Sequence, residues 1–260
     1  MLYFDGENGG IYTDLPYHFH VIYLGTSYLR YHNENIKLKF NLTSGAMFLT
    51  CHPEILAKIK TRQLDVNNAA IRPRLIAYAA TNCVPLRERV FNELVNQFGH
   101  KSGIDALGVC CGTHPELRIR SGSHAALADN SVLFTKYKYV LCMENAHGYG
   151  YLTEKILNVY ASGAIPIYWG DIYSMRVFNP MTYIYVNDSN ISSIFDVIAR
   201  FESDHAAYSA AVMAPVFVSE SALQDFLLVN YDKPTSLLTR IQHATRSMSK
   251  HLSRGGATTT

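Results

Sequence analysis

The spacing of apolar and polar residues divides the chain into two stretches. Up to about Val66, short apolar runs at 2–4, 19–24 and 47–49 are separated by Gly, Pro and Asn, which is typical of short strands joined by turns. Residues 53–59 are the exception, because their apolar side chains have helical spacing. We therefore expect strands and one short helix in this part of the chain.

Beyond this stretch, apolar strand-like runs alternate with amphipathic helical patterns. The run at 74–80 is followed by a helical pattern at 86–98. The alternation continues with strands expected at 139–143, 164–168 and 183–186 and with helices expected at 153–161, 191–201 and 219–229. Because buried strands that alternate with helices form parallel sheets, the pattern predicts an α/β fold of Rossmann type, with ligands at the carboxyl ends of the strands.

A polar junction at 63–72 lies between the two stretches, and we place a domain boundary there. The expected organisation is a small domain over 1–70 followed by a Rossmann-like domain over 71–246. The tail at 247–260 is rich in Ser, Thr and Gly, so we expect it to be disordered.

Composition limits the partners of this chain. Apolar residues make up 48% of its 260 residues, enough for a large core, while charged residues make up 17% and the net charge is +2. A net charge this small does not attract a protein to nucleic acid or to a membrane surface, so any anion site must be local. The chain begins without a signal-peptide pattern and contains no apolar run of transmembrane length, so we expect a cytoplasmic protein.

The cysteines show no spacing that is typical of a zinc site. They number five and stand at Cys51, Cys83, Cys110, Cys111 and Cys142. No two of them form a CxxC pair, and no histidine pair stands at zinc-finger distance. We expect reduced thiols, most of them buried.

The segment after the strand expected at 139–143 has the composition of an anion site. Gly148 and Gly150 allow the backbone to approach a ligand closely, and a helix then begins with Lys155 in its first turn. Free N–H groups at the start of a helix favour anions, and the lysine adds a positive charge. The pattern alone fits equally well a structural loop in which Lys155 is solvated and Glu154 complements the helix dipole.

Longer segments on both sides of this loop resemble a known family. The residues that carry the resemblance are 4–8 (FDGEN), 72–82 (RPRLIAYAATN), 137–145 (YKYVLCMEN), 148–156 (GYGYLTEKI), 164–170 (AIPIYWG) and 178–180 (FNP). In this order they resemble the α-1,3/4-fucosyltransferase family (glycosyltransferase family ten), most closely its bacterial members. The resemblance implies a GT-B fold that pairs a nucleotide-sugar (donor) domain with an acceptor-side domain, which is reduced in this chain. The implied reaction is transfer of a sugar to a glycan hydroxyl with inversion.

The resemblance also implies roles for single residues. Arg87 and Lys155 correspond to the cations that bind the donor diphosphate, and Asn145 and Tyr151 to residues that line the nucleotide-sugar pocket. A guanidinium suits the first role, because two of its N–H groups can contact one phosphate. Glu154 corresponds to the carboxylate that contacts the donor sugar and stabilises positive charge as the glycosidic bond breaks. Without the resemblance, Arg87 would be interpreted as an exposed helix residue.

Glu7 corresponds to the general base of the family, which takes the proton of the acceptor hydroxyl. The next candidates for a base are His18, His20 and Glu144. The chain contains no Asp-x-Asp triplet, the motif that commonly holds a metal ion on the diphosphate, so we expect no metal requirement. His18 and His20 would share one face of a strand and could bind a metal, although isolated histidines more often have ordinary polar roles.

The expected donor is GDP-fucose, and two departures from the family pattern bear on it. Residues 108–114 follow that pattern only loosely, and Met143 replaces a common Phe. One alternative is the same scaffold with another donor, such as UDP-xylose. The other is a catalytically inactive module that binds a sugar nucleotide or a glycan.

Overall fold

The structure is a computed structural model, and it describes nine segments of the chain. They are 2–5, 21–25, 36–41, 44–62, 72–99, 102–119, 130–147, 151–171 and 174–227. The proposed base Glu7, the His18–His20 pair and the tail at 247–260 lie outside the described residues. What we expect of them stays a prediction.

A five-stranded parallel sheet forms the centre of the described structure. Its strands are β4 (Arg74–Tyr78), β5 (Ile104–Ala106), β6 (Tyr137–Leu141), β7 (Ile165–Tyr168) and β8 (Ile184–Tyr185), in the spatial order β5-β4-β6-β7-β8. Tyr78 stands opposite Leu141 in the central pair, so the carboxyl ends of β4 and β6 meet at one edge. The four strands expected from 74 onward are confirmed, with shifts of one or two residues. Strand β5 was not expected, because three residues are too few to show a period.

Helices connect and cover these strands. They are α4 (Pro85–Phe98), α5 (Ser131–Phe134), α6 (Glu154–Ser162), α7 (Ser174–Val177), α8 (Ser192–Ser203), α9 (His205–Met213) and α10 (Glu220–Leu227), with short 3-10 helices η3 (Pro115–Leu117) and η4 (Pro180–Thr182). Pro85 at the first position starts α4, and Gly163, with φ 79°, ends α6.

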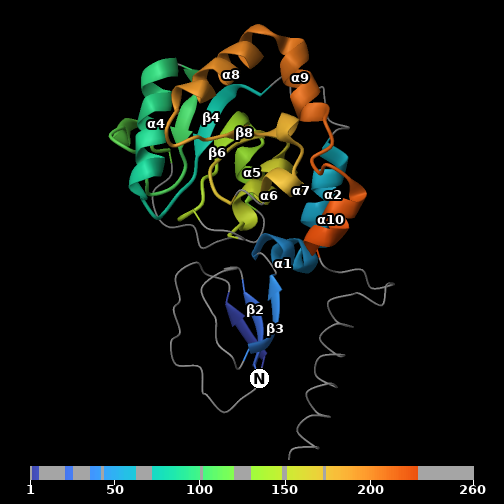
Figure 1. Ribbon diagram of the computed structural model, residues 1–260. Helices are drawn as coiled ribbons and strands as arrows, with labels where there is room; N and C mark the ends of the chain where they lie inside the picture. The colour runs from blue at the N-terminus through green and yellow to red at the C-terminus, as the bar shows by residue number, and fades with distance from the viewer. Residues whose placement is uncertain are drawn as a thin grey trace, which may run out of the picture.

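The two faces of the sheet bury separate apolar cores. In β6, Tyr139 and Leu141 point into the core that includes α4, α8 and α9, while Val140 points into the core that includes α6 and α10. This alternation is the period of a strand, and burial on both faces explains why the strands are continuously apolar. The result is a helix-sheet-helix sandwich (Figure 1).

Residues before β4 form a second sheet and two helices. The strands β1 (Leu2–Asp5), β2 (Val21–Gly25) and β3 (Ile36–Asn41) pair in parallel, and they are followed by α1 (Ser44–Cys51) and α2 (Pro53–Thr61). The strand expected at 47–49 is wrong, since these residues are helical. Ala46 and Leu49, three positions apart, both bury their side chains in the core beside α6, which a helix allows and a strand would not.

Helices α1 and α2 share the core of the central sheet. Ile55 and Ile59 of α2 are fully or almost fully buried with α6 residues, and the N–H of Gly45 donates to the carbonyl of Leu152 over 2.8 Å. Figure 1 shows α1, α2 and α10 side by side. The described helices before the expected boundary near residue 70 are thus packed with the residues after it. The boundary and the reduced acceptor side stay predictions.

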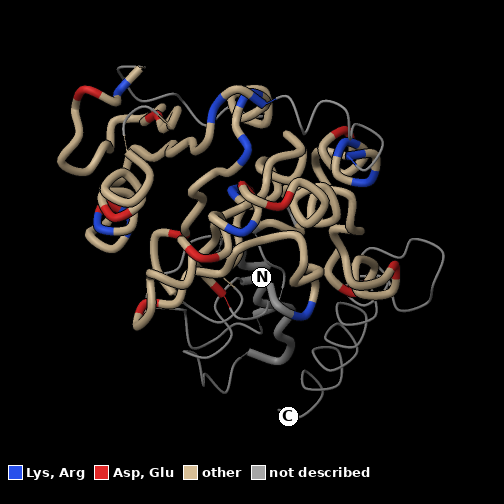
Figure 2. Tube along the Cα trace, turned by 90° about the horizontal axis from the view of Figure 1, so that it is seen from above, with Lys and Arg blue, Asp and Glu red and all other residues tan. Residues whose placement is uncertain are grey.

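Charged residues of both signs are distributed over the described part of the chain. Figure 2 shows basic and acidic residues interspersed along the part of the chain that the structure describes. Among the described helices, none combines the length and the apolar character that crossing a membrane requires.

Candidate active site

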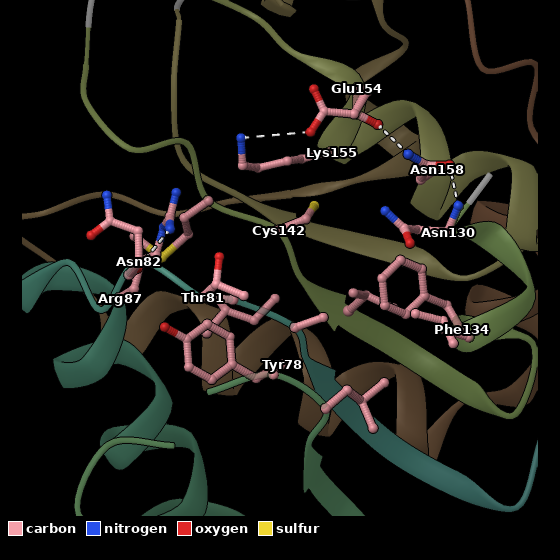
Figure 3. A pocket seen from close by; sticks show the side chains of 18 of the residues that line it. Tyr78, Thr81, Asn82, Arg87, Asn130, Phe134, Cys142, Glu154, Lys155 and Asn158 are labelled. Atoms are coloured by element: carbon pink, nitrogen blue, oxygen red, sulfur yellow. Dashed lines mark hydrogen bonds and ion pairs between the residues drawn. The ribbon is translucent and has the colours of Figure 1, made fainter. Parts of the chain in front are cut away.

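A cavity of about 270 Å³ lies at the carboxyl ends of β4 and β6. Residues that follow these strands form its floor, and α5 and the first half of α6 close its sides. Figure 3 shows Asn82 and Arg87 at one end of it and Asn130, Phe134 and Asn158 at the other. This is the position expected for a ligand in a parallel α/β sheet.

Arg87 lies in the first turn of α4 and is 3% exposed, so the alternative of an exposed helix residue is wrong. Its guanidinium donates to the carbonyl of Asn82 over 3.1 Å and to Oδ1 of Asn145 over 2.6 Å. Within the described residues, its buried Nε has no hydrogen-bond partner. Burial lowers the pKa of Arg87. A buried cation of this kind favours an incoming anion, because the anion completes its hydrogen bonds.

Helix α6 begins at the opposite wall of the cavity. Its N-cap is Thr153, whose side-chain oxygen accepts from the N–H of Lys155. Glu144, which follows β6 and is fully buried, accepts from the N–H and the hydroxyl of Thr153. The Lys155 ammonium donates to Glu144 over 3.0 Å and lines the cavity. The first turn of α6 therefore brings backbone N–H groups and an ammonium to one wall.

Glu154 is the second residue of this turn that lines the cavity. Its carboxylate is 37% exposed and lies 3.9 Å from the Lys155 ammonium. Unlike Glu144, this carboxylate is accessible from the cavity and can contact a ligand.

The far end of the cavity is neutral. Phe134 supplies an aromatic ring, and the buried Asn158 accepts from the N–H of Asn130 and donates to the carbonyl of Glu154. Amides beside an aromatic ring suit a flat polar ring system. The cavity as a whole thus fits a molecule with an anionic group at one end and a ring at the other.

Four of the predicted binding residues meet in this cavity. They are Arg87, Asn145, Glu154 and Lys155. Tyr151 is 3% exposed and stands two residues before Thr153, the N-cap of α6, and it is not among the residues that line the cavity. Glu144, considered as an alternative base, is excluded from that role, because its carboxylate is fully buried and already accepts three hydrogen-bond donors.

The sequence did not reveal that Thr81 and Asn82 help to form the cavity, nor that Asn130 and Asn158 close its far end. Asn82 stands within the segment that resembles the family, so its position was a usable signal. Asn130 precedes α5 and Asn158 lies in α6, and the packing of α5 on α6 brings them together.

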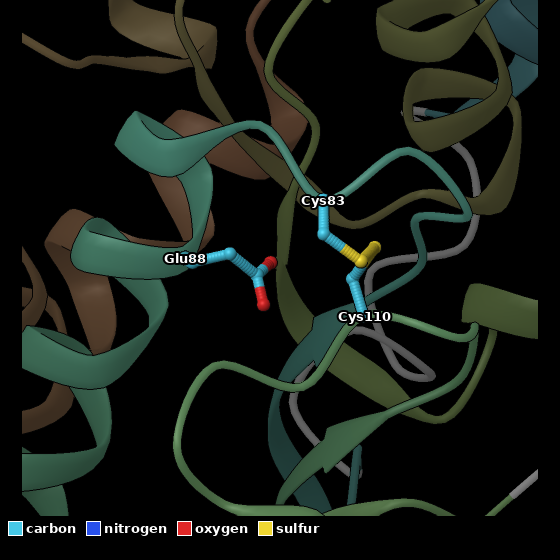
Figure 4. A group of neighbouring side chains, drawn as sticks. All are labelled: Cys83, Glu88 and Cys110. Atoms are coloured by element: carbon cyan, nitrogen blue, oxygen red, sulfur yellow. A yellow bond between two sulfur atoms is a disulfide. The ribbon is translucent and has the colours of Figure 1, made fainter.

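The expectation that all five cysteines are reduced thiols is wrong. Cys83 and Cys110 form a disulfide with a Cα–Cα distance of 5.2 Å, which joins the loop after β4 to the loop after β5 (Figure 4). The two strands are neighbours, so their carboxyl ends bring the cysteines within bonding distance. Glu88 lies beside the disulfide, but the bonded sulfurs offer no thiolate to a metal ion. Cys51 is exposed, whereas Cys111 and Cys142 are buried free thiols.

Comparison with known proteins identifies relatives. Residues 69–211, more than half of the chain, match the C-terminal domain of glycosyltransferase family 10 (fucosyltransferase). Protein R654 of Acanthamoeba polyphaga mimivirus, which carries a fucosyltransferase name, is 28% identical over 84% of this chain and 38% of its own length. The alpha-(1,3)-fucosyltransferase FucT of Helicobacter pylori is 43% identical over 28% of this chain and 16% of its own. The chain thus spans well under half the length of these relatives.

Solved structures show the same fold. A crystal structure of an alpha1,3-fucosyltransferase with GDP superposes with a TM-score of 0.58 and 21% identity, covering 83% of this chain and 66% of the other. One with GDP-fucose gives a TM-score of 0.55 and 22% identity, with the same coverage. The expected GT-B-like α/β fold is confirmed.

Proposed function

The chain belongs to glycosyltransferase family 10, the fucosyltransferases, and on that premise we propose that it transfers fucose from GDP-fucose to a glycan hydroxyl with inversion and without a metal ion. The observation that carries this proposal is the convergence of Arg87 and Lys155 on one cavity from two different helices. The GDP-fucose complex of a protein with the same fold supports the choice of donor.

Departure of the nucleoside diphosphate is the step that these cations assist. As the glycosidic bond breaks, negative charge builds up on the diphosphate oxygens, and fixed positive groups stabilise it without reorganisation. Arg87 has five N–H bonds, and the contacts to Asn82 and Asn145 leave others for the diphosphate, while α6 adds the dipole of its amino end beside Lys155. The diphosphate would lie between the two cations.

The sugar carries the opposite charge in the transition state. Because its ring develops oxocarbenium character, a nearby carboxylate stabilises it, and the cavity-facing Glu154 is suited to this role. Inversion also needs a base on the acceptor side of the sugar, and we assign that role to Glu7 from the resemblance of 4–8 to the family.

The two cations also support the proposal of metal-independent transfer, since they can replace the charge of a metal on the diphosphate. The test is turnover of GDP-fucose with and without a chelator such as EDTA. Equal rates support the proposal, and a rate restored only by added Mg²⁺ or Mn²⁺ overturns it.

Calorimetric titration with a panel of nucleotide sugars tests the donor. We expect binding of GDP-fucose and GDP, with weaker binding of UDP-xylose. Tighter binding of UDP-xylose than of GDP-fucose would indicate a xylosyltransferase instead. Donor binding without release of GDP, in the presence of a mixed panel of glycan acceptors, would identify a binding module instead.

A further inference from the structure

Glu144 is a buried carboxylate with an unusual set of contacts. It follows β6, has no solvent exposure, and accepts hydrogen bonds from three donors: the N–H of Thr153, the hydroxyl of Thr153 and the ammonium of Lys155. A carboxylate that only capped a helix could stay on the surface, where its charge costs little. The burial of Glu144 indicates that its carboxylate orients the Lys155 ammonium beside it.

The contacts of Glu144 fix the direction of the Lys155 ammonium. Lys155 Nζ lies 3.0 Å from Oε2 of Glu144 and 3.0 Å from Oγ1 of Thr153. An ammonium group has three N–H bonds, so these two contacts leave the third for the cavity that Lys155 lines. Lysine is otherwise a flexible point charge, and its orientation here depends on both acceptors.

The surrounding backbone holds Glu144 in place. Its N–H donates to the carbonyl of Trp169 over 2.8 Å, which joins the ends of β6 and β7. A Cβ atom at Gly170 would lie 2.7 Å from Cγ of Glu144, so only glycine leaves room for this side chain. The ends of β6 and β7 therefore fix the position of Glu144.

We infer that Glu144 is a positioning residue for the proposed transfer: it orders the first turn of α6 and holds the Lys155 ammonium charged and aligned for the donor diphosphate, without itself touching donor or acceptor. This inference rests on the proposed function, because the diphosphate is the ligand that Lys155 would contact.

The charges that face Lys155 make the inference testable by pH. Burial lowers the pKa of the Lys155 ammonium, whereas Glu144, Glu154 and Tyr151 raise it, and the net shift is upward. Among the described residues, Arg87 is the other cation that lines the cavity. If the Glu144 charge is removed, the effect of burial remains, and we expect Lys155 to lose its proton at a lower pH.

The experiment is calorimetric titration of GDP-fucose into the wild-type chain and Glu144→Gln between about pH 7 and pH 10. We expect nearly constant wild-type affinity across this range. The affinity of the variant should fall about tenfold from the neutral to the alkaline end, and its kcat should fall at every pH. Glu144→Asp, which keeps the charge, should restore the wild-type pH profile.

Glu202→Gln is the matched control. Glu202 also pairs with a lysine, Lys138, over 2.6 Å and accepts from Tyr139, but these partners lie in β6, away from the cavity. Its pH profile should equal that of the wild-type chain. A Glu144→Gln profile identical to wild type would overturn the inference while leaving the proposed function intact, whereas a wild-type chain that binds no GDP-fucose would overturn both.

A titration of the wild-type chain keeps the inference testable if Glu144→Gln does not fold. The Lys155 signal is assigned by its loss in Lys155→Arg in an NMR experiment on labelled lysine side chains. We expect its pKa to lie above that of an ordinary lysine. An ordinary or lowered pKa would overturn the inference.

Discussion

Arg62, at the end of α2, donates from Nε to the backbone carbonyl of Val212 in α9 over 3.1 Å. The two residues stand 150 positions apart in the chain. The same guanidinium donates to Ala211 and lies 5.2 Å from the centre of the Tyr160 ring, and burial lowers the pKa of Arg62 to about 10. The buried Arg62 guanidinium thus connects α2, which precedes β4, to α9, which follows β8.

Replacing Arg62 with Ala should destabilise the fold. The change removes two hydrogen bonds from a charged donor and leaves the carbonyls of Ala211 and Val212 without it, which costs about 2–3 kcal/mol. We expect Tm to fall by on the order of 5 °C in calorimetric unfolding. Arg176→Ala, at an exposed position of α7, should leave Tm unchanged. Equal Tm values for both variants would show that α2 is not held by this contact.

Replacing Arg87 with Met should weaken donor binding with little loss of stability. Methionine fills the buried space, whereas the charge-assisted contacts to the diphosphate are lost, which corresponds to about 10- to 100-fold in Kd for GDP-fucose. Titration calorimetry measures the change.

Arg89→Met is the matched control for this variant, since Arg89 lies on the same helix with an exposed side chain that donates to the carbonyl of Asp188. Its Kd should equal that of the wild-type chain. If Arg87→Met binds GDP-fucose as tightly as Arg89→Met does, Arg87 does not contact the diphosphate.

The strands of the central sheet could be predicted because burial on both faces makes them continuously apolar. Residues 74–80 and 164–168 are of this kind, and the helices between them have clear amphipathic spacing. Pattern could not predict the short strand β5 or the helix at 47–49. Neither segment is long enough to show its period, and each takes its conformation from contacts with residues far along the chain.

Pattern indicated Lys155 as a candidate cation at a helix start, whereas the other residues of the site were predicted by resemblance. Arg87 and Lys155 reach one cavity only because β4 and β6 are neighbours, and sequence spacing does not encode that neighbourhood. The burial of Glu144 and the pairing of Cys83 with Cys110 are likewise tertiary consequences. The sequence around Glu144 does not indicate its burial, and the positions of the two cysteines do not indicate that they pair.

From the disulfide we predict the number of reactive thiols and the loss of stability when the bond is removed. Denatured but unreduced chain should show three reactive thiols, and five after reduction with a dithiol, in a colorimetric assay. The bond spans 27 positions, so Cys83→Ser should cost roughly 2–4 kcal/mol of unfolding free energy by freeing the unfolded chain. Cys51→Ser, at an exposed thiol, should cost nothing measurable. Five reactive thiols before reduction would contradict the pairing.

Gly108→Ala should disturb both the fold and the cavity, because β4 and β5 end in direct backbone contact. A Cβ atom at Gly108 would lie 2.2 Å from the carbonyl oxygen of Ala80, a backbone atom that cannot turn aside. Relief requires the loop after β4, which lines the cavity, to move, and overpacking of this kind costs about 1–3 kcal/mol. Chemical denaturation should show this loss together with weaker GDP-fucose binding, while Val109→Ala, at an exposed neighbour, should show neither. A stable Gly108→Ala variant with unchanged affinity would mean that the loop adapts and does not set the cavity.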